Sequence, residues 1–106
     1  MRIVDLLSKD SILLNASPKN KAEAIDLLVD LQVKITDREA YKQGILAREE
    51  NGSTAVGEGI AIPHAKNAAV KAPSLAAMTV PDGVDYEALD DEPSNLLFMI
   101  AAPSDG

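Results

Sequence analysis

The sequence predicts an α/β fold, a sandwich in which α-helices flank a mixed β-sheet. Two stretches near the amino end have the apolar spacing of amphipathic helices, and two apolar runs near the carboxyl end have the length of buried strands. The chain of 106 residues has 46% hydrophobic and 25% charged residues, as globular domains do, and suffices for one core. Because only 3% of the residues are aromatic, this core is expected to be aliphatic.

The first elements are a short extended segment and a helix. Residues 12–14 are apolar and form either a short strand or an extended lead-in. A helix is expected over residues 20–34, because Asn20 can cap it and Glu23, three residues later, completes a capping box. Its apolar stripe consists of Ala24, Ile25, Leu28 and Leu31.

A second helix is expected over residues 36–51. Thr36 and Glu39 have the spacing of another capping box, and the pair Asn51-Gly52 is a typical stop signal. The apolar face of this helix consists of Tyr41, Ile45 and Leu46.

Glycines and a proline break any regular pattern in residues 51–67, which are therefore predicted to form a shaped loop around a short extended piece at residues 60–62. Side chains alternate along an extended chain. Ile60 and Ile62 should therefore anchor the loop in the core, while Ala61 faces the other side.

Two strands are predicted in the last third of the chain. Residues 74–81 and 95–103 are apolar runs bounded by turn residues, as expected of strands covered on both faces. Between them, residues 82–94 should form a hairpin-like excursion, extended at residues 84–86 and followed by an acidic turn.

Composition excludes several classes of site. The net charge of −7, without a basic run, argues against binding to nucleic acid or to an anionic membrane surface. The chain has no cysteine and one histidine, which leaves no disulfide, no thiolate chemistry and no histidine-rich metal site. The longest apolar run, residues 96–102, is too short to cross a bilayer, and the amino end lacks the apolar segment of a signal peptide. A cytoplasmic protein is expected.

The single histidine, His64, is the candidate functional residue. Pro63 before it restricts the backbone, and Gly57 and Gly59 upstream permit unusual conformations, although they could also simply form a turn. A neutral imidazole is a nucleophile near pH 7 and can accept a phosphoryl group without a helping base. The alternative is an ordinary surface histidine or a core histidine with its hydrogen bonds satisfied.

Arg48 is the candidate for the positive charge that phosphoryl transfer requires. Its planar guanidinium suits phosphate oxygens, and it lies near the end of the second predicted helix. The alternative is a solvated arginine paired with a nearby glutamate.

Residues 49–65 resemble the active-site signature of the fructose/mannitol-type IIA domain of the bacterial phosphoenolpyruvate-dependent sugar phosphotransferase system. The signature requires specific residue types at nine positions with fixed spacing, and this chain has no mismatch. These positions are Glu49, Val56, Gly57, Ile60, Ala61, Ile62, Pro63, His64 and Ala65. The residues after His64 are more similar to the fructose branch than to the mannitol or nitrogen-regulatory branches.

The resemblance implies a phosphotransferase component of that system, without a cofactor or a metal. His64 would be phosphorylated transiently, receiving the phosphoryl group from the carrier protein HPr and passing it to a cysteine of a IIB domain. Arg48 aligns with the arginine that neutralises the phosphoryl oxygens in the family.

The resemblance also implies that residues 1–106 are the N-terminal portion of the domain. Family members continue past this end with two more helices and a second active-site histidine, which this sequence does not contain. Without those helices, one face of the sheet is expected to leave Leu96, Phe98 and Ile100, or their alternating neighbours, uncovered. We therefore expect self-association or marginal stability.

Three functions compete at this stage. The first is a phosphocarrier for sugar uptake, with fructose as the expected sugar. The second is a regulatory interaction module, of the nitrogen type or attached to a transcription regulator, that is switched by phosphorylation. The third is an inactive fragment.

Overall fold

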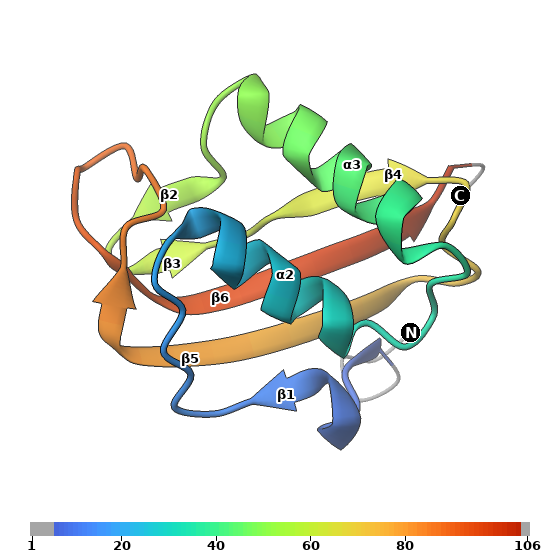
Figure 1. Cartoon of the computed structure of the whole chain (residues 1–106), viewed down its shortest axis with the longest axis horizontal. Coiled ribbons are helices and arrows are strands. Elements are labelled where there is room, and N and C mark those ends of the chain that lie inside the picture. The colour runs from blue at the N-terminus through green and yellow to red at the C-terminus, as the bar shows by residue number, and fades with distance from the viewer. Residues whose placement is uncertain (1–5, 105–106) are drawn as a thin grey trace.

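The structure, a computed structural model, describes residues 6–104 and has two helices packed on one face of a six-stranded sheet (Figure 1). The elements in chain order are η1 (Lys9–Ser11), β1 (Ile12–Leu13), α2 (Lys21–Leu31), α3 (Arg38–Glu50), β2 (Ala55–Gly57), β3 (Ile60–Ala61), β4 (His64–Asn67), β5 (Ser74–Val84) and β6 (Ser94–Pro103). Within residues 6–104, no helix has the length and apolar character needed to cross a membrane.

The sheet is mixed, as the sequence predicted. Its strands have the order β1-β5-β6-β3-β2, and β4 also pairs with β6. The β5–β6 and β2–β3 pairs are antiparallel, whereas β1 runs parallel to β5, and both β3 and β4 run parallel to β6. β3 and β4 follow the same edge of β6 in a common register, with Ile60 opposite Leu96 and His64 opposite Ile100.

The core lies between the sheet and the two helices. Its members are almost all aliphatic, as the composition predicted, and the exceptions are the two tyrosines, both fully buried. On the helices the core residues include Ala24, Ile25, Leu28, Tyr41 and Ile45. On β5 and β6 they include Ala76, Met78, Val80, Leu97, Met99 and Ala101.

The two helices confirm the predicted elements, but the second cap is different. Asn20 caps α2 as predicted, because its Oδ1 accepts from the backbone N–H of Glu23 at 2.9 Å. At α3 the cap is Asp37 and not Thr36: its Oδ1 accepts from the Ala40 N–H at 3.1 Å. Thr36 does not cap the helix, because its N–H and its hydroxyl both donate to the carbonyl of Ala69.

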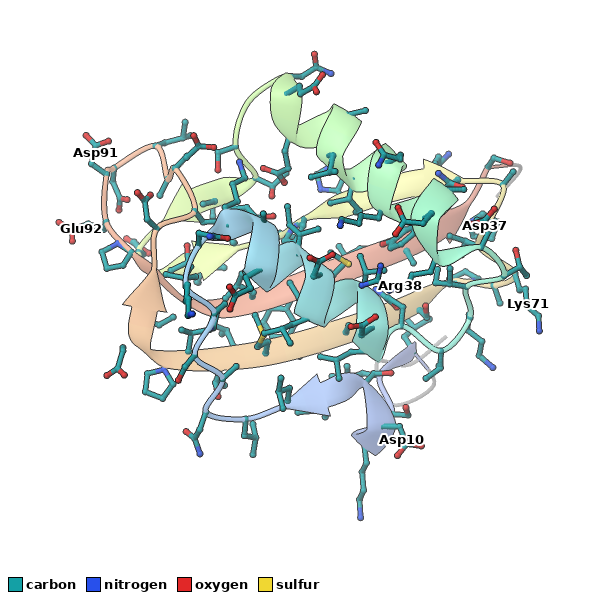
Figure 2. All side chains as sticks on the ribbon, in the orientation of Figure 1. Asp10, Asp37, Arg38, Lys71, Asp91 and Glu92 are labelled. Atoms are coloured by element: carbon teal, nitrogen blue, oxygen red, sulfur yellow. The ribbon has the colours of Figure 1, made fainter. Side chains whose placement is uncertain are left out.

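Figure 2 shows Asp37 and Arg38 together at the amino end of α3. Arg38 reaches across to α2, where its guanidinium pairs with Asp26 and Asp30. This exposed arginine ties the two helices together at their surface.

The extended piece predicted at residues 60–62 is confirmed by β3 (Ile60–Ala61), but the prediction of a loop over the rest of residues 51–67 was wrong, because two further short strands, β2 and β4, lie there. The predicted direction of its side chains was wrong as well. Ala61 is fully buried, whereas Ile60 and Ile62 are only partly buried. The cause is register: β3 continues the pleat shared with β6, which turns Ala61 toward the helices together with its partner Leu97.

The predicted strands near the carboxyl end are confirmed by β5 and β6, and the excursion between them carries Asp91 and Glu92 outward (Figure 2). The prediction that these strands are buried on both faces was wrong for the described chain. Leu96 and Phe98 are partly buried and Ile100 is 39% exposed. These residues alternate with the buried Leu97 and Met99, so they lie on the opposite face of β6 from the core. Self-association through this face stays a prediction.

Candidate functional site

His64 is the first residue of β4, which Ile62 and Pro63 separate from the end of β3. Pro63, which has no N–H, is fully buried, and its carbonyl accepts from the Ile100 N–H of β6 at 2.9 Å. Because successive backbone groups alternate along a strand, the N–H and C=O of Ile62 point the other way, toward the outer edge. His64 itself is exposed.

The hydrogen bond of the imidazole determines which ring nitrogen carries the lone pair. Nδ1 of His64 lies 2.8 Å from the carbonyl oxygen of Ile62. A carbonyl can only accept, so Nδ1 must carry the proton and donate it. The lone pair is therefore on Nε2, the nitrogen at the far side of the ring. This arrangement leaves an unprotonated Nε2 on an exposed side chain.

Two glycines shape the turn before the histidine, as the sequence predicted. Gly57 and Gly59 have φ values of 111° and 79°, which other residues resist, in the turn between β2 and β3. Asp90 Oδ2 closes this turn by accepting from the Glu58 N–H at 3.0 Å. This bond, with a second from the Glu92 N–H, lowers the pKa of the Asp90 carboxyl below its ordinary value.

Arg48 lies in the last turn of α3, where its Nη1 donates to the carbonyl of Gly52 at 2.9 Å. Within residues 6–104 no hydrogen bond joins its guanidinium to His64, and no ion pair joins it to a glutamate. The structure therefore places Arg48 at the end of its own helix and does not bring the two candidate residues into contact.

α3 nevertheless lies along β4 in a way that brings Arg48 toward the His64 end of the strand. The Asn67 side chain donates to the Ala40 carbonyl at 3.1 Å, and Gly44 packs against Ala65 and Asn67. A Cβ placed on Gly44 would lie 2.7 Å from Asn67 Nδ2. The helix and the strand are thus antiparallel (Figure 1), and each turn from Ala40 toward Arg48 moves back along β4 toward its first residue.

Glu49 is the residue whose role the sequence did not reveal. Its carboxylate is buried and accepts from the Thr54 N–H at 3.1 Å, from the Thr54 hydroxyl and from the Tyr86 hydroxyl at 3.3 Å. Lys21 Nζ lies 3.0 Å from Glu49 Oε1 and 2.9 Å from Glu87 Oε1. We call Lys21, Glu49, Thr54, Tyr86 and Glu87 the carboxylate cluster.

The cluster changes the titration of two of its members. Burial, with the neighbouring Glu49, raises the pKa of the Tyr86 hydroxyl far above its ordinary value. For Lys21, partial burial lowers the pKa, but the hydrogen bonds to Glu87 and Glu49 outweigh it and raise the pKa above its ordinary value. Lys21 is therefore charged and Tyr86 neutral at physiological pH.

The surroundings of the carboxylate cluster do not favour an anionic ligand or a metal ion. A shallow cavity of about 400 Å³ opens beside the carboxylate cluster, and Glu49, Glu50 and Glu87 in its wall disfavour an anionic ligand. Among the residues the structure describes, no group of three or more His, Cys, Asp or Glu side chains is arranged to hold a metal ion.

The model of one protein family matches residues 5–106, almost the whole chain. That model describes "Phosphoenolpyruvate-dependent sugar phosphotransferase system, EIIA 2". The chain belongs to this family. The match confirms the resemblance seen in residues 49–65, and the mixed sheet with its helices confirms the fold expected from it.

Two relatives are named as fructose-specific components. The chain is 52% identical over 105 residues to the fructose-specific EIIABC component of Bacillus subtilis, covering 96% of this chain and 16% of the relative. It is 44% identical over 98 residues to the fructose-specific EIIA component of Haloferax volcanii, covering 90% of this chain and 64% of the relative. The chain thus spans less than two thirds of the length of either relative.

Solved structures of IIA proteins have the same fold. The nitrogen regulatory protein IIA-Ntr of Neisseria meningitidis is 28% identical, with a TM-score of 0.88, over 95% of this chain and 70% of that protein. The complex of enzyme IIAMTL with phosphorylated enzyme IIBMTL of Escherichia coli contains a chain that is 27% identical, with a TM-score of 0.80, over 93% of this chain and 73% of that protein.

Proposed function

We propose that the chain is a phosphocarrier of the sugar phosphotransferase system and that Nε2 of His64 carries the phosphoryl group. The observation that supports this most directly is the hydrogen bond from Nδ1 to Ile62, which leaves Nε2 unprotonated on an exposed side chain. Membership of the EIIA family supplies the context for that nucleophile.

The proposed reaction has two balanced steps. In the first, the Nε2 lone pair attacks the phosphorus of phosphohistidine on HPr, a new P–N bond forms, and the P–N bond to HPr breaks with its electron pair going to that imidazole. In the second, a cysteine thiolate of a IIB domain attacks the same phosphorus, and the bond to His64 Nε2 breaks. The Nδ1–H bond to Ile62 can stabilise the positive charge that the ring shares while it is phosphorylated.

Arg48 would supply positive charge to the phosphoryl oxygens. Within residues 6–104 its guanidinium makes one hydrogen bond, to the Gly52 carbonyl, so its other N–H groups can bind a phosphate. Its place in the last turn of α3, toward the His64 end of β4, supports this role.

The relatives suggest the setting of the reaction. The two fructose-specific relatives favour fructose as the sugar, and the IIA–IIB complex favours a IIB domain as the acceptor. Both proposed partners are proteins. An exposed side chain such as that of His64 can be reached by a partner protein, whereas a deep pocket would suit a nucleotide. We place the protein in the cytoplasm and take residues 1–106 as the amino-terminal portion of a IIA domain.

The proposal is tested by phosphorylation with purified partners. The chain is incubated with phosphoenolpyruvate, enzyme I and HPr, and the protein is analysed for acid-labile, base-stable phosphate. Wild type should be labelled and His64→Ala should not. Label that persists in His64→Ala would overturn the choice of nucleophile, and absence of label in wild type would favour an inactive fragment.

Arg48 is tested with a matched control on the same helix. Arg48→Ala should slow single-turnover phosphorylation by roughly a hundredfold, because a charge at the transferring group is lost. Arg38→Ala removes an arginine from the other end of α3, where it pairs with Asp26 and Asp30, and should leave the rate unchanged. Equal slowing in both variants would indicate that Arg48 has a structural role. So would a loss of unfolding free energy in Arg48→Ala as large as the loss of rate expressed as a free energy.

A regulatory module is the second candidate, favoured by the close structural match to IIA-Ntr of Neisseria meningitidis. Both functions would use the same phosphorylated histidine. They differ in the acceptor: transfer of label from His64 to a cysteine of a fructose IIB domain supports the transport function, and label that stays on His64 in its presence supports the regulatory one.

A further inference from the structure

We propose that Glu49 is a positioning residue that fixes the proton of His64 on Nδ1, acting through Thr54 and Ile62. The inference deepens the proposed function, on which its consequence for phosphoryl transfer rests. Glu49 does not touch the imidazole. It is the first member of a chain of hydrogen bonds that ends at the ring.

The series of hydrogen bonds begins at the Glu49 carboxylate, which is bonded to Thr54 twice. Glu49 accepts both the backbone N–H and the hydroxyl of Thr54, and all three groups are buried. Because two hydrogen bonds hold Thr54, it cannot rotate about one of them without breaking the other. The position of Thr54 relative to the end of α3 is therefore set by this carboxylate.

The next two bonds pass through the backbone of a single residue. The Thr54 carbonyl accepts from the Ile62 N–H at 3.0 Å, and the Ile62 carbonyl accepts from His64 Nδ1 at 2.8 Å. Both backbone groups of Ile62 point to the outer edge of the sheet, since the neighbouring Pro63 carbonyl is bonded to β6. The carbonyl that faces the imidazole is thus placed by the Thr54 segment.

The direction of this carbonyl decides the tautomer. While it faces Nδ1, a proton on Nδ1 gains a hydrogen bond and a lone pair there would meet the oxygen lone pairs. If Thr54 were free to move, Ile62 would lose its partner and the carbonyl could turn away. The imidazole would then adopt the mixture of tautomers of a free ring, and part of the population would carry its proton on the nitrogen that must attack.

The carboxylate cluster offers a matched pair of variants for the test. Thr54→Val keeps the side-chain volume and the backbone N–H but removes the hydroxyl bond, which lies on the path to His64. Tyr86→Phe removes a bond to the same carboxylate and leaves the Thr54 hydroxyl bond to Glu49 in place. A purely structural role of Glu49 would make the two variants alike.

Because the chain has a single histidine, every imidazole nitrogen signal in the spectrum belongs to His64. Long-range proton–nitrogen correlation on nitrogen-15-labelled protein reads the tautomer, at a pH about two units above the ordinary imidazole pKa of about 6.5. Wild type and Tyr86→Phe should show Nδ1–H alone and Thr54→Val a mixture. Glu49→Gln should resemble wild type, because its amide oxygen can accept from the Thr54 N–H while its amide N–H donates to the Thr54 hydroxyl oxygen.

Phosphorylation from HPr is then compared in the same proteins. Thr54→Val should be slowed by roughly tenfold or more, since small displacements at a reacting group have effects of this size, and Tyr86→Phe should not. A mixture of tautomers in wild type, or one unchanged tautomer in Thr54→Val, would overturn the positioning role even if His64 is labelled. A tautomer that responds as expected in a chain that is never labelled would support the positioning role and reject the phosphocarrier function.

Discussion

Two buried polar clusters in the described part of the chain differ in charge and in the elements that they join. The carboxylate cluster centres on the charged Glu49. The second, which we call the amide cluster, consists of Gln32, Tyr41 and Ser74. Gln32 Nε2 donates to the Met99 carbonyl at 3.0 Å and its Oε1 accepts from the Ser74 hydroxyl at 2.8 Å, while the Tyr41 hydroxyl donates to the Ile100 carbonyl at 3.3 Å.

The difference lies in what each cluster holds. The amide cluster is neutral and bonds α2 and α3 to the long strands β5 and β6, which the sheet already holds in place. The carboxylate cluster needs donors from α2, from the segment before β2 and from the loop after β5 to satisfy one charge. A buried carboxylate that is left with too few donors is very unfavourable. The charged cluster therefore makes two loops depend on each other, and one of them leads to His64.

The largest expected effect comes from removing the carboxylate. Glu49→Ala leaves Thr54 and Tyr86 with buried donors and weakens the anchoring of Lys21, so the free energy of unfolding should fall by about 3–5 kcal/mol. Chemical denaturation measures it. The matched variant Glu49→Gln should lose less than half as much, and equal losses would show that charge, not hydrogen bonding, holds the cluster.

Removal of the amide should have a smaller effect. Gln32→Ala leaves the Ser74 hydroxyl without its acceptor and removes the side-chain bond to the Met99 carbonyl, at a cost of about 1–3 kcal/mol in the same denaturation experiment. The loss should not alter the tautomer of His64, because none of these groups lies on the path to it. A change at His64 in this variant would contradict the separation of the two clusters.

The two tyrosines, one in each cluster, permit a like-for-like comparison. Tyr86→Phe removes a bond to a charged acceptor and should cost about 1.5 kcal/mol, whereas Tyr41→Phe removes a bond to a neutral carbonyl and should cost about 0.5–1 kcal/mol. Both measurements use thermal and chemical unfolding. If Tyr41→Phe proved the more destabilising, the charge of Glu49 would not be what distinguishes the clusters.

The smallest effect is expected from a modest rise in pH. Burial raises the pKa of both tyrosine hydroxyls far above the ordinary value, and that of Lys21 is also raised. The fold therefore holds protons that the unfolded chain releases, so the stability due to these groups is complete below about pH 10 and declines above it. Tyrosinate absorbance should rise only together with unfolding. An earlier rise would mean that one hydroxyl is accessible in the fold.

Much of the fold follows from local patterns. The α2 cap at Asn20, the apolar faces of both helices and the two long strands were all predictable, because each depends on residues close together in the chain. The α3 cap was not, since Thr36 and Asp37 are equally able to cap. The bridge between Ile35 and Val70 decides between them, by holding Thr36 against the Ala69 carbonyl.

The site was predictable in part, and for the same reason. A lone histidine after a proline, within a nine-position signature, was enough to single out His64 as a candidate. The role of Glu49 was not predictable, because its partners Lys21 and Tyr86 are far from it in the sequence and meet it only in the folded chain. The free nitrogen of His64 also depends on the direction of one carbonyl, which no residue pattern encodes.

Gly44 has a consequence for how α3 is joined to β4. A methyl group at this position would displace the Asn67 amide from the Ala40 carbonyl, because the added Cβ would lie 2.7 Å from Asn67 Nδ2. Its distance to the Ala65 Cβ would be an ordinary 3.7 Å, so the helix and the strand could keep their spacing. The missing side chain at Gly44 thus leaves room for the amide that ties the first turns of α3 to the end of β4.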